Sequence, residues 1–474
     1  MKLDKISKTL STLMISLFAL LILFAAFMGI SNLEYKSYIA AFAAAIVLFG
    51  LYFALRKKLP DIKLKRPLIC LTALCFLVNG LWILIFRIEP DADFKTYWLY
   101  AQALVENQVA VNHYVALFPH IFGYAWVLSG FIKLFGAGKL LAPVINLLLT
   151  CGSGIIIYLL CSKEYGRKAA AFAYLLWIFF PSKLIYNSMV LSEPLYTFLI
   201  LLVIYIIYTI DLKACAEEKP VLKGVVFGAA SGLILRLINC VRPIAAVIII
   251  AFVIWLLLLH GGKDTGKRFR LFVPFFAALL AVYIPLGSLW SSYMEKRMGE
   301  EPTSVTGYSI YVGFNPQTGG SYSDDDMNEL FSCYFGQELS ATDSHKALLE
   351  KAKERMKSGE ISYPSFIAGK IGKLMGNDEG GAFYAEAGLS GSEYSLLCIF
   401  SNIYYYLVIM LSAFGAYITI RNKKYTAMQL CQLYVLGLTC AHMLVEVAGR
   451  YHYSIIPMLV ITAAAAEKKQ NLNI

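Results

Sequence analysis

The chain is poor in charged residues. Asp, Glu, Lys and Arg together make up only 15% of its 474 residues, whereas hydrophobic residues make up 59%. The mean hydropathy is +0.64. These values lie far outside the range of soluble globular domains, so that class is excluded. The expected fold class is an all-α membrane protein that crosses the bilayer many times.

Several catalytic signatures are missing. The sequence has no H-E-x-x-H zinc motif, no C-x-x-C pair, no complete G-x-x-x-x-G-K-[ST] phosphate loop and no G-x-S-x-G turn. Zinc hydrolase, ATPase and serine hydrolase chemistry therefore has no support in the sequence. Of ten cysteines, only Cys333 falls in a large outer segment, so no disulfide framework is predicted.

Long apolar runs are abundant. Runs of about 18 to 22 residues, the length that a helix needs to cross roughly 30 Å of hydrocarbon, predict about twelve transmembrane helices. The expected spans cover residues 10–30, 38–55, 67–86, 139–162, 169–187, 194–211, 221–238, 242–259, 270–290, 395–420, 426–445 and 450–466.

Basic clusters separate these runs, and with twelve spans all of them fall on one side. By the positive-inside rule that side is the cytoplasm, and both termini lie there. This placement accounts for the net charge of +11 without a nucleic-acid partner. The first run follows Lys2, Lys5 and Lys8 but has no small-residue cleavage site after it, so it is expected to be a retained anchor rather than a signal peptide.

Two long outer segments divide the chain. Residues 1–66 form two N-terminal helices, 67–290 a membrane module with the outer loop 87–138, 291–394 a small extracytoplasmic α-rich domain, and 395–474 the C-terminal helices. In the second segment, Ser344–Ser358 and Tyr363–Met375 read as amphipathic helices. Function is expected on these segments, because loops held by a rigid scaffold carry most binding and catalytic residues.

The first outer loop has helical periodicity. Asp93, Tyr97, Tyr100 and Leu104 recur at the spacing of one helix face, which predicts a helix over Asp93–Asn107 with Asp93 as its N-cap. The apolar stretch from Tyr114 to Phe135 could pass for another span, but a span there would invert the charge pattern of later loops. It is expected to form interfacial helices with a turn at Phe118-Pro119-His120.

Asp91 and Asp93 are the leading candidates for chemistry. One carboxylate, Asp93 in preference, could accept the proton of an attacking hydroxyl. The alternative is a solvated turn that ends in a helix cap. Ser192-Glu193-Pro194 also has two interpretations. A serine cap and a first-turn proline are typical of a helix start, whereas Glu193 could instead orient a substrate.

Basic residues at the outer ends of spans form a second group of candidates. Arg236 and Arg242 could bind a lipid phosphate or extend to lipid headgroups. Glu446 and Arg450 could form an ion pair four residues apart, or join His452 in a phosphate or sugar subsite. His120 and His113 are ordinary interfacial residues in the simplest interpretation.

One further cluster, Asp324-Asp325-Asp326, resembles a metal site but precedes a helical pattern at Met327–Phe335. Helix capping explains these three aspartates better than metal binding does.

The order of these features resembles the GT-C fold glycosyltransferases, and within them the protein O-mannosyltransferase and aminoarabinose transferase branch with its uncharacterised bacterial members. The resemblance covers residues 67–260 and, less closely, the last two spans. The residues that carry it are Asp93-Phe94, Tyr97, Ala101, Phe118-Pro119-His120, Phe135-Gly136, Ser192-Glu193-Pro194-Leu195, Arg242-Pro243, Arg450-Tyr451-His452-Tyr453 and Pro457.

The resemblance implies an inverting transferase that moves a sugar, of hexose type, from a polyprenyl-phosphate donor to an acceptor hydroxyl at the outer face of the cytoplasmic membrane. Asp93 would be the base and Glu193 the second acid, with Arg242 or Arg450 on the phosphate. Where the family often has a charged residue beside the turn proline, this chain has Phe118, so any phosphate contact there would fall to His120.

The implied partners are the lipid-linked donor, the bilayer and an acceptor on a protein, a lipid-linked glycan or a wall polymer. No cofactor is required, and a divalent metal is possible but not indicated. The first two spans have no counterpart in the shared module of the family.

Other classes of membrane protein remain open. A flippase or transporter for a lipid-linked sugar would show paired repeats and charges at mid-membrane. An O-antigen-type polymerase or ligase would depend on outer arginine and histidine rather than on Asp93. A receptor or structural role is a further alternative.

Overall fold

The computed structural model describes residues 2–31, 36–56, 65–214, 217–260 and 265–467, and these contain helices and no strand. The all-helical prediction is confirmed for this part of the chain. Residues 57–64, Lys263, Lys468 and Lys469 of the basic clusters, together with Cys215, lie outside the described residues.

Eight helices of the described ranges are long and apolar enough to cross a membrane. They are α1 (Lys2–Ile30), α2 (Lys36–Leu55), α3 (Pro67–Ile85), α7 (Leu141–Glu164), α10 (Glu193–Lys213), α11 (Pro220–Val241), α13 (Thr265–Met298) and α19 (Gly391–Asn422). Twelve spans were predicted, and the other four occur as shorter or interrupted segments.

Two of these four segments are broken, so the prediction of one continuous helix in each is wrong. Residues 169–187 form α8 (Arg167–Ile178) and α9 (Pro181–Tyr186), because Pro181 lacks an N–H and starts a new helix. Residues 450–466 form the 3₁₀ turn η5 (Gly449–Ile455), α21 (Ile456–Ala463) and the 3₁₀ turn η6 (Ala464–Glu467).

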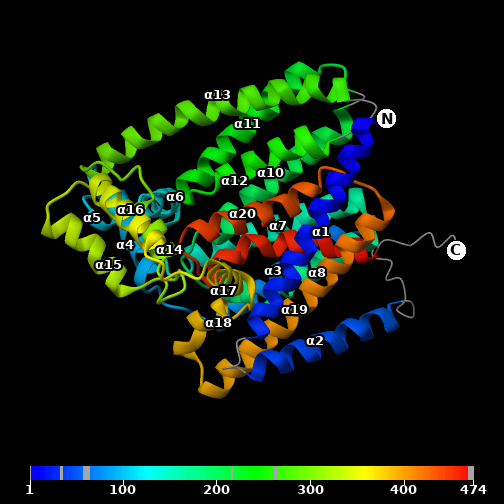
Figure 1. Ribbon diagram of the computed structural model, residues 1–474, viewed down its shortest axis with the longest axis horizontal. Helices are drawn as coiled ribbons and strands as arrows, with labels where there is room; N and C mark the ends of the chain where they lie inside the picture. The colour runs from blue at the N-terminus through cyan, green and yellow to red at the C-terminus, as the bar shows by residue number, and fades with distance from the viewer. Residues whose placement is uncertain (1, 32–35, 57–64, 215–216, 261–264, 468–474) are drawn as a thin grey trace.

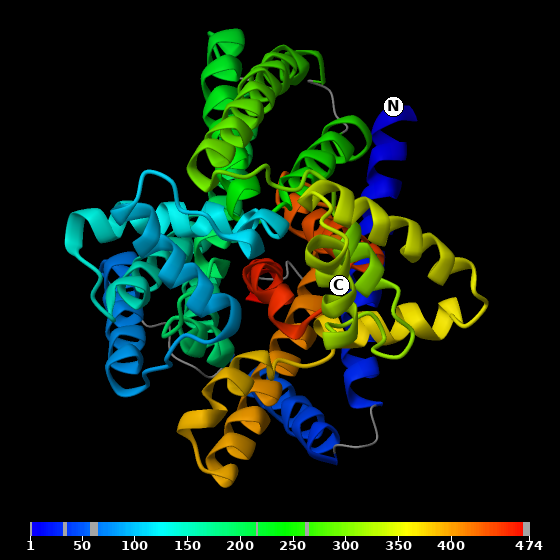
Figure 2. The ribbon, with the colours of Figure 1, turned by 90° about the vertical axis from the view of Figure 1, so that its left-hand side faces the viewer.

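Every residue of α21 is buried. Figure 2 shows this C-terminal segment, in red, near the centre of the molecule with other helices around it. Its apolar character therefore reflects burial in protein on all sides, which a hydropathy pattern does not distinguish from contact with lipid.

The other two predicted spans are present as short helices. Residues 242–259 form α12 (Ala245–Ile254), which continues into the π-helical turn η2 (Trp255–Leu259). Residues 426–445 form α20 (Gln429–Leu444).

The first outer loop folds as the periodicity predicts, into α4 (Ala92–Glu106), α5 (His113–Leu117) and α6 (His120–Phe135), with Pro119 at the turn. The second outer segment begins later than expected, because α13 continues to Met298. Its elements are α14 (Gly307–Gly313), α15 (Asp324–Phe331), the π-helical turn η3 (Ser332–Gly336), α16 (Ala341–Lys357), α17 (Tyr363–Met375), α18 (Gly380–Ala385) and the 3₁₀ turn η4 (Glu386–Gly388).

Elements of both outer segments meet at one end of the molecule. Figure 1 shows α4, α5, α14, α15 and α16 together at the end opposite the N-terminus of α1. A small hydrophobic cluster joins α5 to the second segment through Ala116, Leu117, Tyr308 and Leu348. The backbone adds Thr303 N–H to Ala116 O at 2.9 Å. The second segment is thus fixed onto the first.

Close backbone approaches set how the membrane helices pack. Gly224, Gly228 and Gly232 repeat every four residues along α11, and a Cβ on any of them would lie within 2.5 Å of an α13 carbonyl oxygen. Such small-residue stripes let helices approach in membranes. Gly123 of α6 likewise meets the carbonyl of Cys240, so α6 lies against the end of α11.

Candidate active site

Asp93 lies in the first turn of α4, and the residue before this helix is Asp91, not Asp93. The carbonyl of Asp91 accepts hydrogen bonds from the N–H groups of Phe94 (3.0 Å) and Lys95 (3.3 Å). Neither aspartate makes a side-chain cap bond to this helix. The prediction that Asp93 is the N-cap is therefore wrong, because the helix starts at Ala92 and its N-cap is Asp91, two residues before the predicted one.

The backbone between the two aspartates is strained. Ala92 has φ of +46°, in the left-handed region that residues with a Cβ rarely adopt. Such strain persists only where surrounding structure holds it, and it is concentrated at functional sites. Asp91 is exposed, whereas Asp93 is turned partly inward, with 29% of its side chain accessible.

Both carboxylate oxygens of Asp93 have partners. The hydroxyl of Tyr114 donates to Oδ1 at 2.9 Å, and Nη2 of Arg450 lies 3.3 Å from Oδ2. Tyr114 stands on α5 and Arg450 on η5, so three separate elements fix this carboxylate. Tyr114 was missed as a site residue, because nothing in its sequence surroundings distinguishes it from other interfacial tyrosines.

Two arginines share the ring of Tyr451. The guanidinium of Arg242 lies 4.5 Å from the ring centroid, and that of Arg450 lies 5.5 Å from it and 5.1 Å from the Phe94 ring. Arg242 is the residue directly after α11. Two positive groups thus gather on the Arg450 side of Asp93, supported by aromatic faces that favour cations.

Glu446 is not the ion-pair partner of Arg450. Its Oε1 accepts a hydrogen bond from the Tyr451 hydroxyl at 3.3 Å, whereas the ion pair of Arg450 is with Asp93. The predicted pair at helical spacing fails, because α20 ends at Leu444 and η5 starts only at Gly449. Burial raises the pKa of the Glu446 carboxyl, while Arg450 and Arg242 act to lower it.

Glu193 is the first residue of α10 and is 3% exposed. Ser192 precedes it but makes no cap bond, and its hydroxyl lies 3.5 Å from Glu193 Oε2. The charges of Asp93 and Glu193 both act on Tyr97, whose pKa is raised first by burial and then by Asp93. Tyr97 therefore lies within the field of both carboxylates.

His120 starts α6 within the field of the same charged groups. Burial lowers its pKa to about 3, Arg242 and Arg450 add to this effect, and Asp93 opposes it. The imidazole is accordingly uncharged at neutral pH and can offer a phosphate a hydrogen bond but no positive charge.

Two predicted site residues have their partners elsewhere. Arg236 donates from Nε (2.9 Å) and Nη2 (2.6 Å) to the carbonyl of Tyr283 on α13. His452 is buried, with Nε2 2.9 Å from Asp378 Oδ1 and Nδ1 2.9 Å from the carbonyl of Leu374. Arg236 therefore joins α11 to α13, and His452 holds η5 in place. Neither of these contacts orients the Asp93 carboxylate.

The aspartate cluster at Asp324 is part of a helix start. Ser323 caps α15, and Asp326 is bonded to Arg355 at 2.7 Å and to Asn315 at 2.9 Å. Within the described ranges, no group of three or more His, Cys, Asp or Glu side chains is placed to hold a metal ion.

No family model and no curated protein matches this chain. Solved structures do match it. The archaeal oligosaccharyltransferase AglB from Archaeoglobus fulgidus, in complex with an inhibitory peptide and a dolichol-phosphate, is 12% identical with a TM-score of 0.49. That match covers 84% of this chain and 50% of AglB, so the chain spans about half the length of this oligosaccharyltransferase.

A second match is ArnT from Cupriavidus metallidurans bound to undecaprenyl phosphate. It is 10% identical with a TM-score of 0.35, and the match covers 84% of this chain and 77% of ArnT. Both proteins are GT-C fold membrane glycosyltransferases, the superfamily that the sequence resembles. At these identities and TM-scores the matches transfer no activity and no residue role.

Proposed function

We propose that this protein is an inverting membrane glycosyltransferase of hexosyl type. It takes a sugar from a polyprenyl-phosphate donor and attaches it to an acceptor hydroxyl at the outer face of the cytoplasmic membrane, with both termini in the cytoplasm. The observation that carries the proposal is the accessible Asp93 carboxylate, held between the Tyr114 hydroxyl and Arg450, with Arg242 across the ring of Tyr451.

In this mechanism Asp93 takes the proton of the acceptor hydroxyl as the acceptor oxygen forms a bond to the anomeric carbon of the sugar. The bond from that carbon to the phosphate oxygen breaks on the opposite face, and the lipid phosphate leaves with the electron pair. Because the attack and the departure occur on opposite faces, the anomeric configuration inverts.

Arg450 and Arg242 stabilise the charge that develops on the leaving phosphate, since preorganised cations are most effective in a site shielded from water. A lipid phosphate is already a good leaving group, so one base with cationic stabilisation is sufficient, unlike the two carboxylates of glycoside hydrolysis. The chemistry needs no cofactor. Glu193 and Tyr97 orient the acceptor or the sugar beside Asp93.

The test is Asp93→Asn in the full chain, reconstituted in nanodiscs and assayed for transfer of labelled sugar from a polyprenyl-phosphate donor. Loss of a general base predicts a fall in rate of about 10²- to 10⁴-fold. Asp91→Asn, which alters the exposed neighbour, should stay near the wild-type rate. A fully active Asp93→Asn protein combined with an inactive Arg450 variant would instead favour arginine-dependent polymerase or ligase chemistry.

A further inference from the structure

A polar cavity lies at the end of the molecule away from Asp93. It has a volume of about 90 Å³, is open on one side, and is lined by the start of α1, the end of α10, η2, α13 and the connection from α19 to α20. A water molecule occupies about 30 Å³ of the liquid, so this cavity has room for a small polyatomic group.

The two sites are well separated. Helix α10 starts at Glu193, in the candidate active site, and Asp211 near its other end lines the cavity. Eighteen residues of helix at 1.5 Å each place them roughly 27 Å apart along the axis. Whatever binds in the cavity is therefore not in contact with the groups around Asp93.

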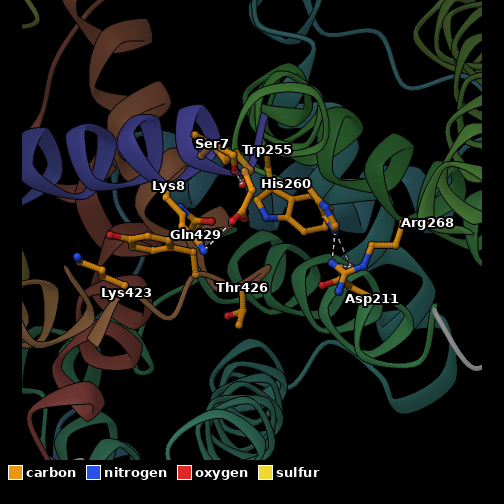
Figure 3. Close-up of a pocket in the computed structure, with 12 residues that line it drawn as sticks. Ser7, Lys8, Asp211, Trp255, His260, Arg268, Lys423, Thr426 and Gln429 are labelled. Atoms are coloured by element: carbon orange, nitrogen blue, oxygen red, sulfur yellow. Dashed lines mark hydrogen bonds and ion pairs between the residues drawn. The ribbon is translucent and has the colours of Figure 1, made fainter. Parts of the chain in front are cut away.

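Charge on one side of the cavity is already balanced. Figure 3 shows Asp211 joined to His260 and Arg268. Asp211 Oδ1 lies 3.0 Å from His260 Nε2 and 3.0 Å from Arg268 Nη1. This carboxylate does not repel an incoming anion strongly, since Arg268 neutralises it at contact distance.

The other side of the cavity carries unmatched positive charge. Lys8 and Gln429 lie on this side, and the exposed Lys423 also lines the cavity (Figure 3). Lys8 is paired with Asp4 at 2.8 Å, whereas Lys423 has no ion-pair partner within the described ranges. The lining as a whole has three full cations, Lys8, Arg268 and Lys423, against two carboxylates. The balance favours an anion.

An unpartnered donor points to the kind of ligand. Gln429 is 3% exposed, yet its amide Nε2 makes no hydrogen bond with any described residue. A buried donor without an acceptor is costly, and such groups in native proteins usually have a bound partner. Gln429 is one of the residues that line the cavity, so a ligand oxygen bound there is the acceptor that we assign to its amide.

We propose that this cavity binds a phosphate group, with the Gln429 amide donating to a phosphate oxygen and Lys423 and Lys8 supplying positive charge. Basic pockets between membrane helices on the cytoplasmic side are suited to anionic headgroups. The phosphate can belong to a membrane phospholipid or be free in solution. In either case the ligand ties α1 to the connection between α19 and α20.

The test measures the unfolding temperature of the full chain in maltoside detergent micelles, which contain no phosphate, with either phosphatidylglycerol in the micelle or inorganic phosphate in the buffer. Stabilisation by phosphatidylglycerol alone identifies a lipid headgroup, and stabilisation by inorganic phosphate identifies a soluble ligand. A ligand that binds only the folded state raises the midpoint in a concentration-dependent way.

Gln429→Leu removes the donor at similar volume and should weaken the apparent affinity about tenfold or more, since it deletes a hydrogen bond to a charged group. Lys423 is exposed, so Lys423→Ala tests the same site without a change in the core. This variant should also have a weaker apparent affinity. Lys353→Ala, at an exposed position of α16, is the matched control and should bind as the wild type does. The proposal is overturned if neither ligand stabilises the wild type, or if both site variants respond as the control does.

Discussion

At the scale of single residues, two arginines of this protein differ in what their guanidinium groups contact. Arg450 faces a carboxylate that is still accessible, whereas Arg236 is bonded twice to one backbone carbonyl. The first arrangement leaves N–H groups for a substrate. The second uses the side chain to join α11 to α13.

This difference predicts opposite outcomes for matched substitutions. Arg450→Gln should reduce sugar transfer by about 10²-fold or more, because a lost electrostatic stabiliser of a developing anion typically costs that much. Arg236→Gln should lower the unfolding temperature and leave the rate per folded molecule nearly unchanged. The transfer rate per folded molecule and the unfolding temperature are measured for both variants. Equal losses of activity would contradict the different roles of Arg450 and Arg236.

A buried histidine of the second outer segment gives a pH prediction. Burial lowers the pKa of His345 to about 4 from an ordinary value of 6.5, and its Nδ1 accepts a hydrogen bond from Tyr308 N–H at 3.4 Å. Below pH 6.5 the unfolded segment binds a proton that the folded one does not. The stability contributed by neutral His345 is therefore present above pH 6.5 and is lost as the pH falls toward 4.

Hydrogen exchange of residues 307–357 should accordingly accelerate between pH 7 and pH 5, after correction for the intrinsic pH dependence of exchange. His345→Gln should flatten that change, because glutamine does not titrate. If exchange in His345→Gln still accelerates as much between pH 7 and pH 5, another titrating group causes the pH dependence of this segment.

At the scale of elements, the sequence predicts well where local signals act and poorly where packing decides. The turn at Pro119 and the inward face of α4 follow from proline chemistry and from helical periodicity. The break at Pro181 could also have been found from its proline. The division of residues 450–466 into η5, α21 and η6 could not be found from hydropathy, because the segment is buried among other helices.

The candidate site shows the same limit. Asp93, Arg242 and Arg450 could each be selected as ionisable residues at the ends of apolar runs. The contact of Asp93 with Arg450 joins residues 357 positions apart, and the common ring of Tyr451 joins α11 to η5. Such partnerships depend on the packing of distant elements, on which a single sequence carries no signal.

The contact of α6 with the end of α11 gives a prediction for an element. In Gly123→Ala the new Cβ would meet the carbonyl oxygen of Cys240 at 1.9 Å, so the two helices must separate and Arg242 must move. Transfer activity and thermal stability should both fall. Gly130→Ala on the same helix meets nothing within 4 Å, and its higher helix propensity should stabilise slightly, by about 0.5 to 1 kcal/mol. Equal behaviour of the two variants would argue against a tight α6–α11 contact.

At the scale of the whole molecule, the two candidate sites lie at opposite ends, and the proposed orientation places them on opposite faces of the membrane. Lys353→Cys on α16 should react with an impermeant maleimide added outside intact cells. Lys267→Cys on α13 should react only after the membrane is opened. Both lysines are exposed, so labelling reports on the side of the membrane rather than on burial. Labelling of both from one side would overturn the topology.

The separation of Asp93 and Arg450 along the chain also has a consequence for biogenesis. The ribosome synthesises Asp93 357 residues before Arg450. A nascent or truncated polypeptide that stops before η5 carries the Asp93 carboxylate without the Arg450 guanidinium, so the proposed site is incomplete until η5 has been made.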